Sequence, residues 1–572
     1  MEHYDWNDGW LFTPVFDPAI VRPECPELTL EPVRLPHTVK ALPYNYCNEN
    51  DYQKLSGYRR EFFAPKEWEG RTVLLTFGAV AHDATVFCNG RRVFHHSCGY
   101  TAFTVDLTSA LHLGQKNVVA VRCDSREDLN IPPFGGQMDF LTYGGICRAV
   151  CLDVKEPAYL RDIFIETKAE GGFRIYTATV GETVGCTLQA EIRSPSGSRA
   201  FYTGELSLPI TGALNSVHPW SIEHPTLYTL TVRLIRPGTG GLPDRVLDEK
   251  SCRFGFRTLQ FVAGGLYLNG QRVELRGLNR RQSYAYQGYA MPDSLQRLDA
   301  QFIKKDLGCN AVRTSHYPYA EEFYDLCDRE GILVMDETPA VGIGGGAAVN
   351  PYKEYPLAEH HRQVLAEMIH RDKNHPCVVL WSLGNEPDLE HFPQDAYDYW
   401  HPLYELAHQL DPQDRPVTLV CCQNDYTKDI TTRTMDIVCI NRYYGWYNLS
   451  GDMDAACYGL NQELDFWAEQ HKPVMMSEYG ADTVAGLHTA GAEMFSEEFQ
   501  VEFYRRLDAE FDKRPWFVGE FVWNFADYDT VQGPMRVDGN KKGLFTRDRR
   551  PKLGMHFLRQ RWAEIPTFGF KE

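Results

Sequence analysis

Two glutamates in this chain of 572 residues have the type and placement needed for chemistry on a glycosidic bond. Glu386 follows the apolar segment Val378–Trp381, and Glu478 follows the apolar segment Val474–Met476. Hydrolysis of a glycoside needs one carboxyl group that protonates the leaving oxygen and a second one on the opposite face of the sugar. A single glutamate after a strand is more often part of a surface ion pair, whereas two in matching positions favour a glycosidase.

The part of the chain that must position these glutamates, residues 258–572, has the pattern of a (β/α)8 TIM barrel. Short apolar segments alternate with helical ones such as Ala358–Ile369 and Glu497–Phe511. We expect eight barrel strands: Val273–Leu275, Ala311–Arg313, Ile332–Met335, Val378–Trp381, Val417–Val420, Ile437–Ile440, Val474–Met476 and Phe517–Val522. Barrel active sites lie at the C-terminal ends of the strands. The fourth and seventh strands would bring Glu386 and Glu478 face to face there.

The first 257 residues have the pattern of β structure in two units. Residues 1–157 contain short apolar runs such as Arg71–Phe77 and Ala84–Cys88, separated by turn residues, which predicts a jelly-roll-like β-sandwich. Residues 158–257 continue with the candidate strands Ile163–Thr167 and Thr226–Val232, and their length suits an immunoglobulin-like β-sandwich. The predicted fold is a multidomain chain with two β-sandwiches followed by a C-terminal TIM barrel.

Composition limits the partners and the compartment. The formal net charge of -19 makes nucleic acid and anionic membranes poor partners, and an acidic ligand would need a local cationic pocket. No apolar run is long enough for a membrane span, and the first residues lack the pattern of a secretory signal. The 16 cysteines are scattered without the spacing of zinc ligands or a disulfide framework. We therefore expect a cytoplasmic protein without metal or cofactor.

Across essentially its whole length the chain resembles glycoside hydrolase family 2, the family of β-galactosidases and β-glucuronidases. The resemblance is carried by the segments Gly384–Pro387, Arg313–Pro318 and Ser477–Gly480. It implies a sugar-binding type of first sandwich and a retaining double displacement, with Glu386 as acid/base and Glu478 as nucleophile. The two carboxyl groups would then lie about 5–5.5 Å apart.

The two glutamates need different protonation states. Glu386 must be protonated when substrate arrives, and the negative charge of Glu478 nearby favours that state. Glu478 must stay ionised, which hydrogen bonds from Tyr447 or a nearby arginine would favour. By resemblance, Asn385 binds the 2-hydroxyl of the sugar, a contact that strengthens in the transition state.

The segment Arg536–Gly543 resembles the element with which β-glucuronidases hold the carboxylate of their substrate, and which β-galactosidases lack. Lys542 would supply a positive charge and Asn540 amide donors, and Arg536 is close in sequence. The resemblance therefore predicts a uronic acid substrate.

Four further residues are assigned to the site by resemblance. Tyr443 and Tyr447 match glucuronidase positions that touch the nucleophile and the uronate. Asp139 matches an acidic residue that the first sandwich lends to the 4-hydroxyl, although an aspartate in a glycine-rich loop is more often a turn former. Trp523 would be a platform for the apolar face of the sugar, and a core tryptophan is the competing interpretation.

One position departs from the family pattern. Most of the family reads Asn/Gly-Arg-His-Glu after the first barrel strand, whereas Asn279–Gln282 has Arg281 in place of the histidine. Arginine is longer, permanently charged and only a donor. It could reach an axial 4-hydroxyl or add to carboxylate binding, which leaves the choice between glucuronate and its C4 epimer galacturonate open.

These observations predict a retaining exo-β-D-hexuronidase that releases terminal β-linked glucuronate or galacturonate from a small conjugate or an oligosaccharide. The short segment Gly342–Ala348 after the third strand predicts an open entrance on the leaving-group side. A β-galactosidase for neutral sugars and a non-catalytic carbohydrate-binding relative are the alternatives. The aromatic-rich sandwiches are compatible with a homo-oligomer.

Overall fold

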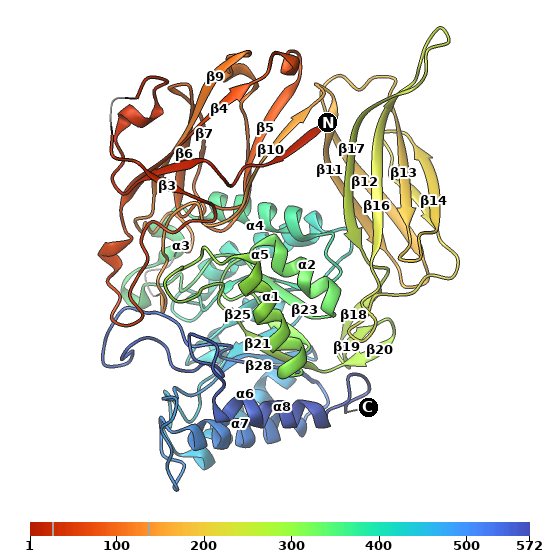
Figure 1. Cartoon of the computed structure of the whole chain (residues 1–572). Helices are drawn as coiled ribbons and strands as arrows, with labels where there is room; N and C mark the ends of the chain where they lie inside the picture. Colours follow the sequence, from red (N-terminus) through yellow and green to blue (C-terminus); the bar gives the residue numbers. More distant parts are fainter. Residues whose placement is uncertain (26–27, 135–137, 572) are drawn as a thin grey trace.

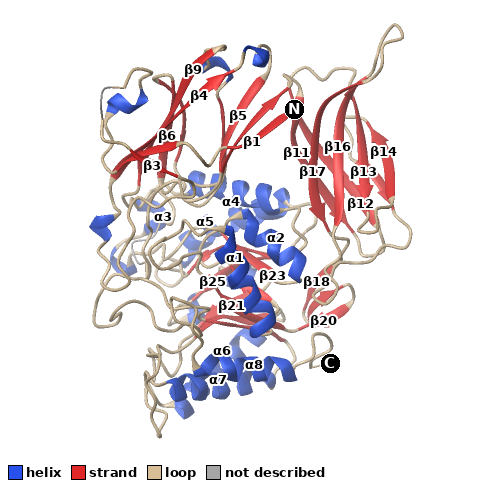
Figure 2. Ribbon diagram, viewed as in Figure 1, coloured by secondary structure: helices blue, strands red, loops and turns tan. Residues whose placement is uncertain are grey.

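The computed structural model describes residues 1–25, 28–134 and 138–571. A larger sandwich formed by the N-terminal residues and a smaller one stand side by side over a helix-covered barrel (Figure 1). Strands dominate the two sandwiches and helices surround the barrel, as the colouring by secondary structure makes clear (Figure 2). The arrangement confirms the fold class expected from the sequence.

The first sandwich consists of two antiparallel sheets whose strands alternate between buried and exposed side chains. One sheet has the order β1 (Glu2–Asp5), β10 (Val150–Lys155), β5 (Thr72–Phe77) and β8 (Phe103–Asp106). The other has the order β3 (Glu31–Val33), β2 (Trp10–Thr13), β4 (Leu55–Ala64), β9 (Gln115–Asp124), β6 (Asp83–Cys88) and β7 (Arg91–His96). The β6–β7 hairpin turns at Asn89 and Gly90, both with positive φ, as the Asn-Gly pair favours.

The second sandwich has its own apolar core, which is separate from that of the rest of the chain. One sheet contains β11 (Tyr159–Thr167), β12 (Gly172–Val180) and β15 (Ile210–Ala213). The other contains β14 (Arg199–Gly204), β13 (Thr187–Arg193), β16 (Tyr228–Arg236) and β17 (Arg245–Phe254). The aligned sheets give the expected immunoglobulin-like type of sandwich.

Within residues 138–571, eight parallel strands close into the barrel. They are β21 (Leu275–Asn279), β22 (Ala311–Arg313), β23 (Leu333–Glu337), β24 (Val378–Asn385), β25 (Val417–Cys421), β26 (Val438–Asn441), β27 (Val474–Tyr479) and β28 (Phe517–Val522). The prediction of Val273–Leu275 as the first barrel strand was wrong in its position, because the barrel strand begins at Leu275 and continues to Asn279. Val273 ends a separate antiparallel sheet of β18 (Leu259–Val262), β19 (Gly265–Leu268) and β20 (Gln271–Val273). One apolar run therefore covers the end of β20 and the start of β21.

The helices cover the outside of the barrel (Figure 2). They are α1 (Asp293–Gln301), α2 (Glu321–Glu330), α3 (Pro351–Glu354), α4 (Ala358–Asp372), α5 (Pro393–Leu410), α6 (Met453–Ala468), α7 (Glu497–Asp512) and α8 (Leu553–Glu564). The predicted helices correspond to α4 and α7. Ser496 caps α7, because its hydroxyl accepts a hydrogen bond from the Phe499 amide.

The first sandwich and the barrel share one continuous apolar core, whose members run from Trp6 to Ile565 along the chain. Polar contacts reinforce this junction near the barrel mouth. The Tyr143 hydroxyl donates to Asp529 at 3.1 Å, and the Tyr289 hydroxyl donates to the Leu141 carbonyl at 3.2 Å. The sandwich loop that contains these residues is therefore held at the end of the barrel where the active site is expected.

Two properties of the described residues concern the environment of the protein. None of their helices has both the length and the apolar character that crossing a bilayer requires. All 16 cysteines are described, and each is a free thiol.

The barrel closes tightly where β21 pairs with β28, which leads to a stability prediction. A Cβ atom at Gly277 would lie 2.5 Å from ring carbons of Phe521. We expect Gly277→Ala to destabilise the protein by about 1–3 kcal/mol, since the buried ring cannot move aside freely. Gly172→Ala is the control, because a Cβ there meets nothing closer than 4.0 Å. Equal thermal midpoints for the two variants would contradict the tight closure.

Candidate active site

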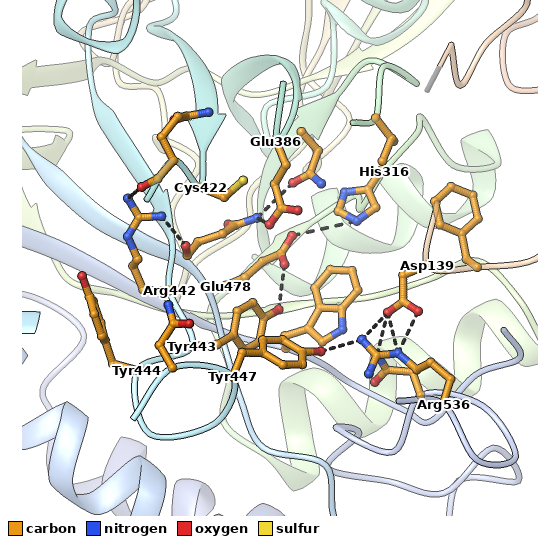
Figure 3. Close-up of a pocket in the computed structure, with 18 of the residues that line it drawn as sticks. Asp139, His316, Glu386, Cys422, Arg442, Tyr443, Tyr444, Tyr447, Glu478 and Arg536 are labelled. Carbon is orange, nitrogen blue, oxygen red and sulfur yellow. Dashed lines mark hydrogen bonds and ion pairs between the residues drawn. The ribbon is translucent and has the colours of Figure 1, made fainter. Parts of the chain in front are cut away.

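A cavity of about 550 Å³ opens at the C-terminal ends of the barrel strands (Figure 3). Glu386 and Glu478 both line it, and they come from the ends of β24 and β27. Asp139 and Phe140 reach the same cavity from the loop of the first sandwich. The cavity is therefore built by two domains, with the two candidate catalytic carboxyl groups on one side.

The backbone holds Glu386 in a conformation that few residues adopt. Its φ of 52° lies in the left-handed region, which is unfavourable for a residue with a side chain. Its amide donates to the Val420 carbonyl at 2.9 Å, which fixes the chain as it leaves β24. The carboxylate oxygen Oε1 accepts a hydrogen bond of 2.7 Å from the Asn441 amide. Such strain at the end of a barrel strand is typical of functional positions.

Glu478 has two donors that favour its ionised form. Arg313 Nη1 donates to Oε1 at 2.6 Å, and the Tyr443 hydroxyl donates to Oε2 at 2.8 Å. The sequence prediction of an arginine as donor agrees with this geometry. Of the two tyrosines named from the sequence, Tyr443 donates to Glu478, whereas Tyr447, which was expected to favour the ionised form of Glu478, bonds to Lys542.

The Arg313 guanidinium joins the ends of five barrel strands. It makes a two-point ion pair with Glu337, with distances of 2.8 and 2.9 Å. It also donates to Asn279 at 2.9 Å and to Asn385 at 2.7 Å, in addition to its bond to Glu478. The Arg313 side chain is 0% exposed, so each of these bonds replaces a contact with water. This network fixes the nucleophile candidate relative to the amide beside the acid candidate.

Burial and hydrogen-bond partners affect the pKa values of the two glutamates differently. Burial raises the pKa of Glu386 and of Glu478, because both carboxylates lose contact with water. Each charge also raises the pKa of the other group in such a pair. Arg313 and Tyr443 bond directly to Glu478, whereas Glu386 has the neutral amide of Asn441. Direct hydrogen bonding therefore favours the ionised form of Glu478 more than that of Glu386.

Aromatic and apolar side chains form part of the wall of the cavity. Trp523 lines the cavity and stacks on His316, with ring centroids 5.1 Å apart and planes at 17°. Phe140, Val341 and Tyr528 pack in one apolar cluster with Trp523. The tryptophan is thus both a buried packing residue and a surface that a sugar ring could cover.

His316 stays neutral at the pH values at which most enzymes work. Burial lowers its pKa to about 4. Its Nδ1 lies 2.9 Å from Glu337 Oε1, and its Nε2 lies 3.9 Å from Glu478 Oε1. With the Nδ1 proton shared with Glu337, Nε2 is left as an acceptor beside the cavity.

A charged cluster occupies the side of the cavity near the first sandwich (Figure 3). Arg536 Nε donates to both oxygens of Asp139, at 2.7 and 2.9 Å. Arg536 Nη2 also donates to the Tyr447 hydroxyl at 2.5 Å, and the Asn540 amide donates to Asp139 at 3.0 Å. Asp139 therefore links the sandwich loop to the barrel loop that contains Arg536 and Asn540.

Lys542 lies one layer behind this cluster. Its side chain is fully buried and is absent from the described lining of the cavity. The ammonium group donates to the Tyr447 hydroxyl at 2.8 Å and forms an ion pair with Asp482. Burial lowers the pKa of Lys542 to about 8, and the charge of Asp482 opposes this shift. Tyr447 thus bridges the buried ammonium group and the guanidinium of Arg536.

Arg281 also lies behind the wall of the cavity. Its guanidinium carbon is 3.7 Å from the ring centre of Phe140 and 5.1 Å from that of Tyr528, and both rings line the cavity. The described lining does not include Arg281 itself. A direct contact between Arg281 and a sugar would therefore require Phe140 to move.

Sequence reasoning omitted several residues from the site. His316 lies in a segment that carries the family resemblance, and Glu337 and Asn441 each end a barrel strand, so strand position was the available signal. Asp482 follows Glu478 by four residues, after the strand has ended, and no motif marks it. Its role depends on a contact with a residue 60 positions away in the chain.

Groups of side chains that could hold a metal ion lie elsewhere in the described chain. One consists of His3, Cys151 and Asp153, and the other contains His375. Neither group contributes to the lining of the cavity.

The matches to family sequence models agree with this architecture. "Glycosyl hydrolases family 2, TIM barrel domain" matches residues 260–567, and the sugar binding domain of the same family matches residues 33–157. A third model, "Glycosyl hydrolases family 2", matches residues 158–257. The chain belongs to glycoside hydrolase family 2.

The relatives define the branch of this family. A solved β-glucuronidase structure from Faecalibacterium prausnitzii is 55% identical, covers 100% of this chain and 98% of that chain, and has a TM-score of 0.90. A Bifidobacterium dentium β-glucuronidase complexed with coumarin-3-O-glucuronide is 38% identical, with 100% and 98% coverage and a TM-score of 0.89. A β-glucuronidase of Streptococcus agalactiae is 32% identical over 92% of this chain and 91% of its own length. The protein is a glycoside hydrolase of the β-glucuronidase type.

The bond between Tyr443 and Glu478 leads to a prediction about pH dependence. Tyr443→Phe removes a donor to the carboxylate, so the pKa of Glu478 should rise further. The acid limb of kcat/KM should then move to higher pH, and kcat should fall about 10–100-fold. The measurement is a pH profile on an aryl β-glucuronide.

Tyr404→Phe is the matched control for this profile. Tyr404 donates to Asp436 at 2.7 Å outside the cavity, so the acid limb should stay in place. An unchanged limb in Tyr443→Phe would show that this hydroxyl does not stabilise the reactive carboxylate.

Proposed function

We propose that the chain is a retaining exo-β-glucuronidase with Glu386 as acid/base and Glu478 as nucleophile. The observation that carries this proposal is the unequal bonding of two glutamates that line one cavity. Arg313 and Tyr443 donate hydrogen bonds to Glu478 and none to Glu386, which suits Glu478 as the ionised nucleophile and Glu386 as the group that holds the proton for the leaving group.

The proposed reaction has two steps. Glu386 gives its proton to the glycosidic oxygen while a Glu478 oxygen attacks the anomeric carbon, so the bond to the leaving group breaks and a glycosyl ester forms. The charge of Glu478 is consumed in the ester, which lowers the pKa of Glu386. Glu386 then takes a proton from water, and the water oxygen displaces Glu478. Two inversions leave the β configuration unchanged.

We propose that the charged cluster recognises the carboxylate of the substrate. Arg536, Asn540 and Tyr447 line the cavity on one side, and Lys542 supports Tyr447 from behind. These groups provide the local positive charge that an acidic protein needs in order to bind an acidic sugar. The Bifidobacterium dentium relative, solved with a glucuronide, supports the same substrate class.

Asn385, Asp139 and Trp523 complete the proposed sugar site. Asn385 would bind the 2-hydroxyl and Asp139 the 4-hydroxyl, while Trp523 would cover an apolar face of the ring. All three line the cavity. In the segment that follows β23, Val341 contributes to the described lining of the cavity. We propose that the short segment Gly342–Ala348 leaves the leaving-group side open to bulky conjugates.

The family models also support the proposed domain limits. We place the first sandwich at residues 1–157, the immunoglobulin-like sandwich at 158–257 and the barrel at 258–572. The matched ranges of 33–157, 158–257 and 260–567 agree with these limits.

A test of the two carboxyl roles compares Glu386→Ala with Glu478→Ala. We expect kcat to fall about 100–10,000-fold in the acid/base variant, and activity to be lost in the nucleophile variant. Azide should rescue each variant, because a small anion can take the empty position. The product should be a β-glycosyl azide with Glu386→Ala and an α-glycosyl azide with Glu478→Ala. The opposite pairing of anomers would exchange the two roles, and full activity in Glu478→Ala would refute the mechanism.

β-Galacturonide hydrolysis is a second candidate activity, favoured by Arg281 in the position of the family histidine. Because Arg281 is separated from the cavity by Phe140, we expect its effect on the C4 epimers to be small. Arg281→His should change the ratio of kcat/KM for aryl β-glucuronide over aryl β-galacturonide by less than about threefold. Asp139→Asn, a change inside the cavity, should alter the ratio more. A larger shift in Arg281→His would make Arg281 the epimer selector.

A further inference from the structure

The buried Lys542 raises a physical question, because an ammonium group is costly to hold away from water. Three aromatic rings surround it: the ring centres of Tyr447, Trp446 and Tyr443 lie 4.6, 5.5 and 5.6 Å away. The ring faces attract a cation, but they do not replace a counter-ion. Asp482 is the acidic group that bonds to this ammonium in the described chain.

Asp482 is held rigidly in place by the structure around it. Its carboxylate oxygen Oδ1 accepts a hydrogen bond of 2.9 Å from the Lys541 amide, while Oδ2 pairs with the Lys542 ammonium. The side chain is 5% exposed and does not contribute to the described lining of the cavity. Asp482 therefore contacts Lys542 directly and lies 3.8 Å from Arg536 Nη1, without lining the cavity.

We propose that Asp482 is a positioning residue for uronate selectivity: it keeps the Lys542 ammonium charged and aimed at Tyr447, although it touches no substrate itself. The proposal rests on the proposed function, in which Lys542 and Tyr447 act on the substrate carboxylate. The proposed nucleophile Glu478 lies in β27 and Asp482 follows the same strand, so one segment would serve both the reaction and the recognition of charge.

The charges around Lys542 determine the direction of the effect. Asp482 and Asp139 favour the ammonium form, whereas Arg536 disfavours it, and Tyr447 and Tyr443 are neutral near pH 7. With burial included, the pKa of Lys542 is about 8, so the ammonium form predominates at neutral pH. Removing the Asp482 charge lowers this pKa further and leaves a neutral amine beside Tyr447.

Asp482→Asn tests the proposal, because it keeps the shape of the side chain and removes its charge. At pH 7 we expect KM for an aryl β-glucuronide to rise about 10–100-fold, since a charge-assisted contact is lost. KM and kcat for the matching aryl β-glucoside, which has no carboxylate, should change less than about threefold. In the wild type, KM for the glucuronide should rise above about pH 8. In Asp482→Asn that rise should begin at lower pH.

A double variant shows whether Asp482 acts through Lys542. Lys542→Met and Asp482→Asn/Lys542→Met should have the same ratio of kcat/KM for glucuronide over glucoside, because the effect of Asp482 is lost once its partner is gone. The double variant also removes both members of the buried pair, which avoids an unpaired buried charge if Asp482→Asn alone folds poorly. Asp482→Glu, which restores the charge, should recover part of the glucuronide selectivity.

Asp248→Asn controls for the general cost of removing a buried carboxylate. Asp248 pairs with Lys155 at 3.0 Å and accepts the Leu160 amide at 2.8 Å, a bonding pattern like that of Asp482 but remote from the cavity. This variant should lower the thermal midpoint without changing the ratio of glucuronide to glucoside kcat/KM.

Three outcomes would overturn the proposal. Equal losses on glucuronide and glucoside in Asp482→Asn would show a merely structural role. A lower KM for the glucuronide would show that Asp482 competes with the substrate for Lys542. Additive effects in the double variant would show that Asp482 acts through another group. If Lys542→Met itself leaves the glucuronide to glucoside ratio unchanged, the proposed function of Lys542 fails, and that failure is distinguishable from the three results above.

Discussion

The buried guanidinium of Arg313 is the interaction on which the active site depends. It lies between two carboxylates, Glu337 and Glu478, and it also bonds to Asn279 and Asn385. A charge removed from water must be paired and hydrogen-bonded, and here every partner is at the end of a different barrel strand. Closure of the barrel therefore assembles this network, and the network in turn fixes the position of the Glu478 carboxylate.

A second constraint is the interface between the first sandwich and the barrel. The shared apolar core holds the sandwich against the barrel, and the loop with Asp139 and Phe140 completes the cavity. Through Asp139, that loop also binds Arg536 of the barrel. A sugar site made by the barrel alone would lack one wall, which gives a physical reason for a sandwich in front of the catalytic domain.

Because the chain is acidic overall, binding of an acidic sugar depends on the few cationic side chains in the cavity and directly behind it. A protein with a formal net charge of -19 repels anions at long range, so affinity for a uronic acid has to arise from short-range contacts. The cluster around Arg536 and Lys542 has two cations and two carboxylates, Asp139 and Asp482. Paired charges of this kind can be buried and oriented before the ligand arrives.

Much of the fold could be predicted from the sequence, because it depends on local patterns. Alternation of apolar residues indicated the sandwiches, and buried strands alternating with helices indicated the barrel. Strand position and family resemblance then placed Glu386 and Glu478 in one cavity. The boundary between β20 and β21 was the exception, since the continuous apolar run Val273–Leu275 contains no signal for the change of sheet.

Contacts between distant residues were decided by the tertiary structure alone. The sequence indicated that an arginine and a tyrosine would support Glu478, but packing determined that they are Arg313 and Tyr443. The sequence marked Arg281 as unusual, yet only the fold places Phe140 between it and the cavity. Local propensity and periodicity describe neighbours along the chain, whereas burial and pairing of charge depend on which segments meet in space.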